Sequence, residues 1–84
     1  MKEILQFSSE GCGPCKQLSP KMEKLQSEGK IKYKKVDVDV DLDLVTKYGI
    51  RNIPTLILIN GSGEVLNRMS GNQDEQSILN FYNK

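Results

Sequence analysis

Apolar and polar positions alternate along the chain in blocks, and the period of each block predicts a strand or a helix. Residues 2–8 have apolar side chains on both faces, which is typical of a central strand in an α/β sheet. Ile4 lies on one of these faces, and Leu5 and Phe7 lie on the other. Residues 12–28 follow as a predicted helix, because their apolar side chains recur at helical spacing. Those side chains are Cys15, Leu18, Met22 and Leu25.

The first predicted helix contains a proline and stops at a glycine. Pro20 is expected to kink the helix without ending it, because the apolar spacing continues beyond this residue. Gly29 is a natural C-terminal stop. In this helix we expect Cys15 to point inward, while Cys12 occupies the exposed N-terminal end.

The rest of the chain predicts three more strands and two more helices. The expected strands are residues 31–39, 55–59 and 64–69, and the expected helices are residues 41–48 and 72–82. A strand, a crossover helix and a second strand form a right-handed unit with parallel strands. We therefore expect an α/β fold in the order βαβαββα, with helices on both faces. Its four-stranded mixed sheet would have the strand order 2-1-3-4.

Length and charge limit the classes of function. The 84 residues suit a single domain, residues 1–84, with an adequate but thin core. A formal net charge of +1 gives no reason to expect nucleic acid or an anionic membrane as a partner. No apolar run is long enough for a membrane span, and the first residues lack the apolar region of a signal peptide. We expect a cytoplasmic protein, and a monomer.

Both cysteines of the chain lie in one motif, at the joint between the first strand and the first helix. The spacing of Cys12 and Cys15 in a first helical turn puts both sulfurs on the same side, within reach of a disulfide. The unpaired N–H groups and the partial positive charge of a helix N-terminus stabilise a thiolate at Cys12, which is the reactive form. Pro14 suits a first helical turn, and Gly13 leaves one side of the sulfur pair open.

In the cytosol such a cysteine pair is typical of catalysis or of metal binding. The chain has no histidine, which excludes Ser-His and Cys-His catalytic pairs. Two cysteines alone cannot complete a four-ligand zinc site within one chain. We therefore expect no metal and no cofactor beyond the Cys12–Cys15 disulfide. One alternative stays open, a metal or cluster bridged between two chains through these cysteines.

Several segments together resemble the thioredoxin family, in a short form. Residues 12–16 match its Cys-Gly-Pro-Cys-Lys active-site motif, and Pro20 sits where that family kinks its active-site helix. Residues 35–39 resemble its second core strand, and residues 47–55 resemble the segment that leads to its cis-proline. The resemblance covers residues 3–82 and implies a thioredoxin-like fold.

The resemblance also implies roles for residues outside the cysteine motif. Pro54 would be a cis-proline that keeps an extra residue or a metal away from the thiols. It would leave the backbone of Ile53 free to pair with an extended substrate. Gly71 would flank the same substrate groove, and Lys35 would point toward the active site from the second strand.

The chain departs from the family's pattern in ways that bear on the chemistry. The leading strand and helix of the family have no counterpart, and no tryptophan precedes Cys12. Gln6 stands where thioredoxins usually bury an aspartate behind the second cysteine. A glutamine amide cannot accept a proton at neutral pH. If the family mechanism uses that carboxylate to help deprotonate the second thiol, Cys15 must here use water, Lys35 or the leaving thiolate. We therefore expect a Gln6→Asp substitution to alter the pH dependence of Cys15.

The leading hypothesis is a thiol–disulfide oxidoreductase of thioredoxin type that reduces protein disulfides. Cys12 as thiolate would attack a substrate disulfide, and Cys15 would then resolve the mixed disulfide. The resemblance implies a flavin-dependent thioredoxin reductase as the electron source. It also implies ribonucleotide reductase as one of the substrates.

Two further hypotheses stay open at the level of the sequence. A glutaredoxin-like enzyme reduced by glutathione is favoured by the small size and the missing tryptophan. The Gly13-Pro14 pair between the cysteines and the lack of an obvious glutathione-carboxylate site weigh against it. A binding module with idle thiols, such as an accessory subunit of a polymerase, would keep the same fold.

Overall fold

Four strands and three helices follow one another along the chain in the computed structural model, which describes residues 1–84. The strands are β1 (Lys2–Ser8), β2 (Tyr33–Asp37), β3 (Thr55–Asn60) and β4 (Val65–Ser70). The helices are α1 (Gly13–Ser27), α2 (Leu42–Tyr48) and α3 (Glu75–Asn83). Their order is the βαβαββα order that the hydrophobic pattern predicts.

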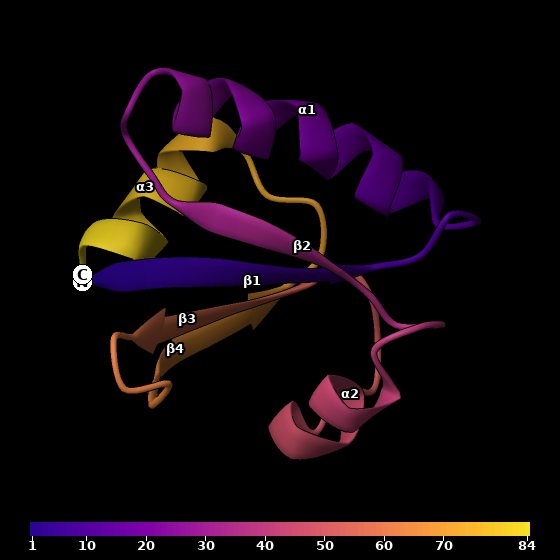
Figure 1. The fold of residues 1–84 in the computed structure, drawn as a ribbon. Helices are drawn as coiled ribbons and strands as arrows, with labels where there is room; N and C mark the ends of the chain where they lie inside the picture. Colours follow the sequence, from indigo (N-terminus) through magenta and orange to yellow (C-terminus); the bar gives the residue numbers. More distant parts are fainter.

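The strands form one mixed sheet in the order β2-β1-β3-β4, which confirms the predicted topology. β1 runs parallel to β2 and antiparallel to β3, and β4 is antiparallel to β3. Figure 1 shows β1 between β2 and β3, so it has a hydrogen-bonded neighbour on each side. This central place explains why β1 carries apolar residues on both faces.

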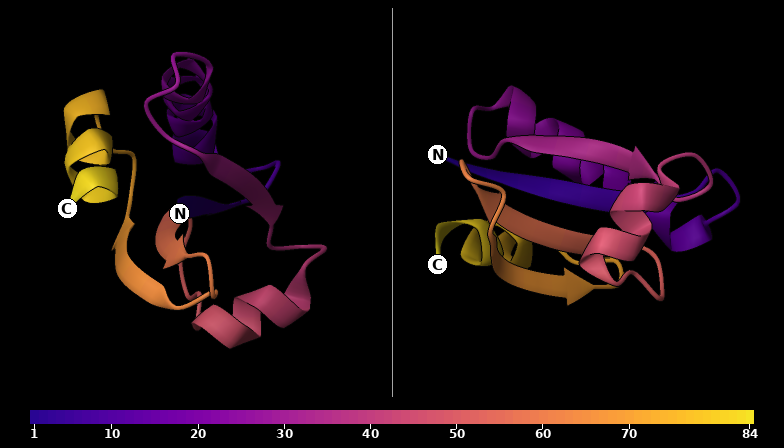
Figure 2. Two further views of the ribbon diagram at one scale, coloured as in Figure 1. Left: turned by 60° about the vertical axis from the view of Figure 1, so that its left-hand side comes forward. Right: turned by 60° about the horizontal axis from the view of Figure 1, so that its bottom comes forward.

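The helices cover both faces of the sheet. α1 and α3 lie on one face, and α2 lies on the other (Figure 1, and the left view of Figure 2). Ile4 belongs to a cluster of nine buried apolar residues that also includes residues of α1 and α3. Leu5 and Phe7 belong to a second cluster, which includes Tyr48 of α2. Successive residues of β1 therefore pack into opposite cores, as their alternation predicts.

Both chain termini lie at the end of the sheet opposite the loop that joins β1 to α1 (Figures 1 and 2). The hydroxyl of Tyr82 donates a hydrogen bond to the backbone oxygen of Lys2 (3.2 Å). The Lys2 ammonium in turn donates to the backbone oxygen of Tyr82. These contacts connect the end of α3 to the start of β1, far from the cysteine motif.

β2 is shorter than the 31–39 segment that the pattern predicts. Ile31 is buried, at 5% exposure, but it lies ahead of the strand. The strand ends at Asp37 because the chain turns there. The backbone oxygen of Asp37 accepts from the N–H of Asp41 (2.8 Å), and its carboxylate accepts from the N–H of Asp39 (2.9 Å).

α3 begins at Glu75, three residues later than predicted. The reason is the cap at Asp74, whose backbone is extended and whose carboxylate accepts a hydrogen bond from the N–H of Ser77 (2.8 Å). An N-cap residue is only half inside its helix, so the regular turns start after it. The helix packs through Ile78 and Phe81, which are its buried residues.

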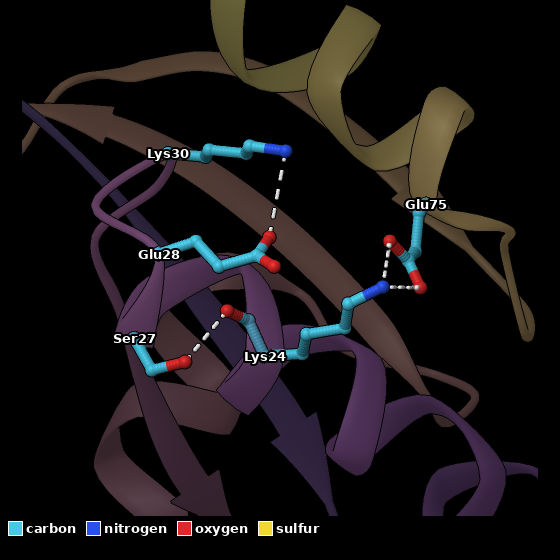
Figure 3. Close-up of polar contacts among 5 residues, drawn as sticks. All are labelled: Lys24, Ser27, Glu28, Lys30 and Glu75. Carbon is cyan, nitrogen blue, oxygen red and sulfur yellow. Dashed lines mark hydrogen bonds and ion pairs between the residues drawn. The ribbon is translucent and has the colours of Figure 1, made fainter.

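α1 runs through Pro20 to Ser27, as predicted. Glu28 is its C-cap, and Gly29 follows with φ of 74°, a left-handed conformation that favours glycine. Figure 3 shows the polar contacts around this end of the helix. Lys24 forms an ion pair with Glu75 of α3 (3.1 Å), and this hydrogen bond raises the pKa of the Lys24 ammonium. Both partners are exposed, so the pair adds little to stability.

Candidate active site

The two cysteines lie at the start of α1, directly after the loop that leaves β1. Cys12 is the N-cap residue of α1, Cys15 lies in the first turn, and the two form a disulfide. Their Cα atoms are 5.2 Å apart, inside the range of about 4.4–6.8 Å that disulfides need. The sulfur of Cys12 also accepts a hydrogen bond from the N–H of Cys15 (3.1 Å). The spacing of the motif therefore places both sulfurs at the helix N-terminus.

The two cysteines differ in their exposure to solvent. Cys15 is 2% exposed and Cys12 is 9% exposed, so Cys12 is the outer residue of the pair. The expectation of an exposed position for Cys12 is nevertheless too strong. Its sulfur lies over the first turn, where it receives the N–H of Cys15, and most of the residue is covered.

The surface next to the disulfide is open on the side of the intervening residues. Gly13 and Pro14 are both exposed. A Cβ placed on Gly13 would meet no heavy atom within 4 Å beyond its chain neighbours and the backbone of its own helix. The first turn of α1 contains no acidic residue that would oppose a thiolate. The helix N-terminus therefore offers its partial positive charge to Cys12 without a competing carboxylate in that turn.

A second set of candidate residues lies in the loops before β3 and after β4. The peptide bond between Ile53 and Pro54 is cis. Gly71 donates its N–H to the backbone oxygen of Pro54 (2.9 Å). Its φ of 91° is a left-handed conformation that glycine adopts without strain. The structure thus brings together Pro54 and Gly71, to which the family resemblance assigns one groove.

The loop after β4 is fastened to α1 by side chains that sequence reasoning did not identify. The amide of Asn72 donates to the side-chain oxygen of Gln17 (2.8 Å) and accepts from the ammonium of Lys21 (3.0 Å). Lys21 also donates to the backbone oxygen of Gln73 (3.1 Å). Gln17 and Lys21 are four residues apart on α1, so they lie on one face of it. These contacts hold the Gly71 loop against the helix that starts at the cysteines.

Gln6 is fully buried beneath α1, at 0% exposure. Its side-chain nitrogen donates to the hydroxyl of Ser19 (3.0 Å), and that hydroxyl donates to the backbone oxygen of Cys15 (3.0 Å). The structure therefore links Gln6, through Ser19, to the backbone of the second cysteine. Ser19 is a new member of the site. Its position four residues after Cys15, on the same helix face, is the signal that could have identified it.

Lys35 lies opposite Gln6 in the parallel register of β1 and β2. It lines a polar pocket of about 730 Å³ together with Cys15 and Ser19. The other charged residues of this pocket are Glu10, Lys16, Glu23 and Asp37. Lys35 therefore shares a pocket with the second cysteine, although it makes no hydrogen bond to it.

Comparison with known proteins assigns the chain to a family. The family model described as Thioredoxin matches residues 1–84. The chain belongs to the thioredoxin family. The thioredoxin of Rickettsia felis is 37% identical over 83 residues, which cover 96% of this chain and 78% of the relative. The mitochondrial thioredoxin of Mus musculus is 35% identical over 83 residues, which cover 96% of this chain and 49% of the relative.

Solved thioredoxin structures agree with this assignment. A mutant thioredoxin from Halobacterium salinarum NRC-1 has a TM-score of 0.88 and 33% identity. The match covers 96% of this chain and 71% of that one. Fasciola hepatica thioredoxin has a TM-score of 0.88 and 30% identity, over 98% of this chain and 78% of that one.

Family membership and the paired cysteines together define the activity. The chain is a thiol–disulfide oxidoreductase of thioredoxin type. Such an enzyme acts on protein disulfides and receives its electrons from a reductase. Thioredoxins carry these electrons in the cysteine pair itself. No set of three or more His, Cys, Asp or Glu residues is arranged to hold a metal ion. None of the helices has the length and apolar character needed to span a bilayer.

Proposed function

We propose that Cys12 is the nucleophile of this thioredoxin and that Cys15 is the resolving thiol. The Cys12 thiolate attacks one sulfur of a substrate disulfide, which forms a mixed disulfide and releases the other substrate sulfur as a thiolate. Cys15 then attacks Cys12, which frees the second substrate sulfur and restores the Cys12–Cys15 disulfide. Two electrons pass to the substrate in each cycle.

The observation that carries this assignment is the difference between the two cysteines. Cys12 caps the N-terminus of α1 and is the more exposed of the two, whereas Cys15 is almost completely buried. A partner sulfur can approach only a residue with access to solvent. The helix N-terminus also favours the thiolate there.

We propose that Ile53, Pro54 and Gly71 form the groove for the substrate chain. The backbone N–H and C=O of Ile53 make no hydrogen bond within the protein. Ile53 is half-buried, and the residue after it is held by Gly71. A free backbone donor and acceptor next to the cis-proline suit pairing with an extended peptide.

The proposal includes the partners that the family resemblance implies. A flavin-dependent thioredoxin reductase restores the dithiol, and ribonucleotide reductase is one proposed substrate among disulfide proteins of the cytoplasm. Glutathione is the competing electron source. The rate at which the oxidised protein is reduced distinguishes the two electron sources. Thioredoxin reductase and glutathione are compared at the same concentration of reducing equivalents.

Two single substitutions test the roles of the cysteines. Cys12→Ser should lower the reduction of insulin disulfides to the uncatalysed rate, because no nucleophile is left at the helix N-terminus. Cys15→Ser should instead accumulate mixed disulfides with substrate, because the first step proceeds and the second cannot. Non-reducing electrophoresis and mass spectrometry detect the trapped species. Wild-type turnover by Cys12→Ser would refute the assignment.

A further inference from the structure

One buried atom behind the disulfide has no hydrogen-bond partner. Gln6 is 0% exposed, and its side-chain nitrogen donates to the hydroxyl of Ser19 (3.0 Å). Its side-chain oxygen, Oε1, is buried and unpaired. Buried polar atoms are almost always paired, so an unpaired acceptor requires an explanation.

Ser19 determines which way the Gln6 amide faces. The Ser19 hydroxyl gives its single proton to the backbone oxygen of Cys15 (3.0 Å), so toward Gln6 it can only accept. The amide must therefore present its nitrogen to Ser19. Rotating the amide by half a turn would remove one of the two hydrogen bonds. Oε1 is consequently the amide atom without a hydrogen-bond partner while the cysteines form a disulfide.

We propose that Oε1 of Gln6 accepts the hydrogen bond of the Cys15 thiol in the reduced protein, and that Ser19 is the positioning residue for this amide. The inference deepens the proposed function and rests on its dithiol state. A dithiol reductant, R(SH)₂, breaks the bond between the two cysteine sulfurs and supplies two electrons and two protons. The products are two cysteine thiols and the disulfide of the reductant. Reduction thus creates an S–H donor on Cys15, the residue whose backbone oxygen is linked to the Gln6 amide through Ser19. That amide carries a buried acceptor without a donor.

The surroundings of Cys15 leave this thiol few other partners. Cys15 is 2% exposed, so little water reaches its sulfur. Gln6 lies on the same side of β1 as Ile4, whose cluster includes Leu18 and Met22 of α1, so its amide lies under the first turns of that helix. Neither Gln6 nor Ser19 titrates near neutral pH. The charged residues that face this region line the adjoining pocket: Glu10, Lys16, Glu23, Lys35 and Asp37.

The proposal predicts a change in the redox equilibrium. The acceptor is unpaired in the disulfide form and paired in the dithiol form, so it favours the dithiol. Gln6→Leu keeps a similar size and removes the acceptor. Equilibration with dithiothreitol should then shift about tenfold toward the disulfide, which corresponds to a reduction potential ~30 mV more negative. Gln76→Leu, the same change on the exposed surface of α3, is the matched control and should leave the equilibrium unchanged.

A spectroscopic measurement tests the hydrogen bond directly and needs no substrate. In Cys12→Ser, Cys15 carries the only thiol, so its S–H stretching band in the infrared is unambiguous. The band should lie at lower frequency in Cys12→Ser than in Cys12→Ser/Gln6→Leu, because a hydrogen bond weakens the S–H stretch. Equal frequencies would overturn the proposal. The roles of the cysteines in catalysis would be untouched by that result.

Substitutions of Ser19 test whether its hydroxyl positions the Gln6 amide, and they leave Gln6 itself unchanged. They also keep the proposal testable if Gln6→Leu does not fold. Ser19→Ala frees the amide to rotate and should shift the equilibrium with dithiothreitol toward the disulfide. Ser19→Thr keeps the hydroxyl and should restore the wild-type value. Equal shifts in both variants, or none in either, would contradict a positioning role for the hydroxyl.

Discussion

At the scale of single residues, neutral side chains lie behind the buried cysteine, and charged side chains line the pocket next to it. Cys15 has the neutral side chains of Gln6 and Ser19 behind it. Lys35 is the cation that reaches the same pocket from the sheet. Because Lys35 is exposed, solvent and salt screen its effect on Cys15. The geometry therefore assigns Lys35 a modest electrostatic role, smaller than that of a buried charge.

Lys35→Met tests this role. Removal of the positive charge disfavours the Cys15 thiolate, so alkylation of Cys15 near neutral pH should slow in a Cys12→Ser background. The expected factor is about 1.4 to 5, because exposed charge pairs are worth about 0.2–1 kcal/mol. Lys34→Met is the control, since Lys34 lies on the opposite face of β2, with Val36 of the second core. Equal slowing by both substitutions would point to a general loss of charge and not to a specific effect of Lys35.

The sequence predicts the residues of this site whose signal is local and misses those that depend on tertiary contacts. The cysteine pair follows from its spacing, and the cis-proline at Pro54 follows from the family resemblance. Ser19 and Asn72 act across elements, through Gln6 on β1 and Gln17 on α1. Serine and asparagine are common on surfaces, so their identity alone does not reveal such contacts.

At the scale of elements, capping residues set where helices begin. Asp74 accepts the backbone N–H of Ser77, and this hydrogen bond lowers the pKa of its carboxyl below the ordinary value of 3.8. The charge of Lys21 acts in the same direction, with a smaller effect. A carboxylate at this position also interacts favourably with the N-terminus of α3. The cap therefore fixes the start of the helix that carries Ile78 into the core.

Asp74→Ala should lower the thermal midpoint at neutral pH, because the backbone N–H of Ser77 loses its partner at the start of α3. The pKa is lower in the folded state than in the unfolded state. The stabilisation is therefore present above the unfolded pKa and is lost as pH falls through the folded one. The thermal midpoints of wild type and Asp74→Ala, measured by circular dichroism, should therefore differ most at about pH 7. The difference should become smaller as the pH falls below the unfolded pKa toward about pH 2.

Two neighbouring substitutions serve as controls for the cap. Asp74→Asn keeps an acceptor without a charge, so its thermal midpoint should exceed that of Asp74→Ala and depend less on pH. Glu75→Gln removes only the exposed ion pair with Lys24 and should change the midpoint little. If the difference in thermal midpoint between wild type and Asp74→Ala stays constant down to the lowest pH, the stabilisation does not come from the carboxylate of Asp74.

Element boundaries are predicted less well than element order, and for a physical reason. The period of the apolar residues identifies the segment of a strand or helix that packs against the core. For this reason the bounds of β1 and α2 are predicted almost residue for residue. The ends depend on side-chain hydrogen bonds to the backbone. Asp37 ends β2 and Asp74 delays α3, and neither residue interrupts the apolar pattern.

At the scale of the whole molecule, stability rests on two cores that share one sheet. The cluster under α1 and α3 contains nine buried residues, and the cluster under α2 contains five. Leu18 and Met22 anchor α1, the helix that begins at the cysteines, in the larger cluster. Ile78 comes from the other end of the chain and joins the same cluster. The position of the disulfide therefore depends on packing by residues distant from it in sequence.

Ile78→Ala tests this dependence. Ile78 is 0% exposed, and truncation of a buried isoleucine to alanine costs about 2–5 kcal/mol. Small proteins have a free energy of unfolding of about 5–15 kcal/mol, so the loss should be a large share of the total. Urea unfolding should show a lower midpoint with an unchanged slope. Leu66→Ala, at a residue that is 49% exposed, should stay within about 0.5 kcal/mol of wild type.

The same variants show whether Ile78 affects the reductase activity only through the fraction of the protein that is folded. If α3 acts on the site only by holding α1 in place, the reductase activity of Ile78→Ala should follow its folded fraction as urea is added. The activity per folded molecule should then equal that of wild type. A loss of activity in conditions where circular dichroism shows the variant to be fully folded would mean that Ile78 also sets the geometry of the cysteine pair.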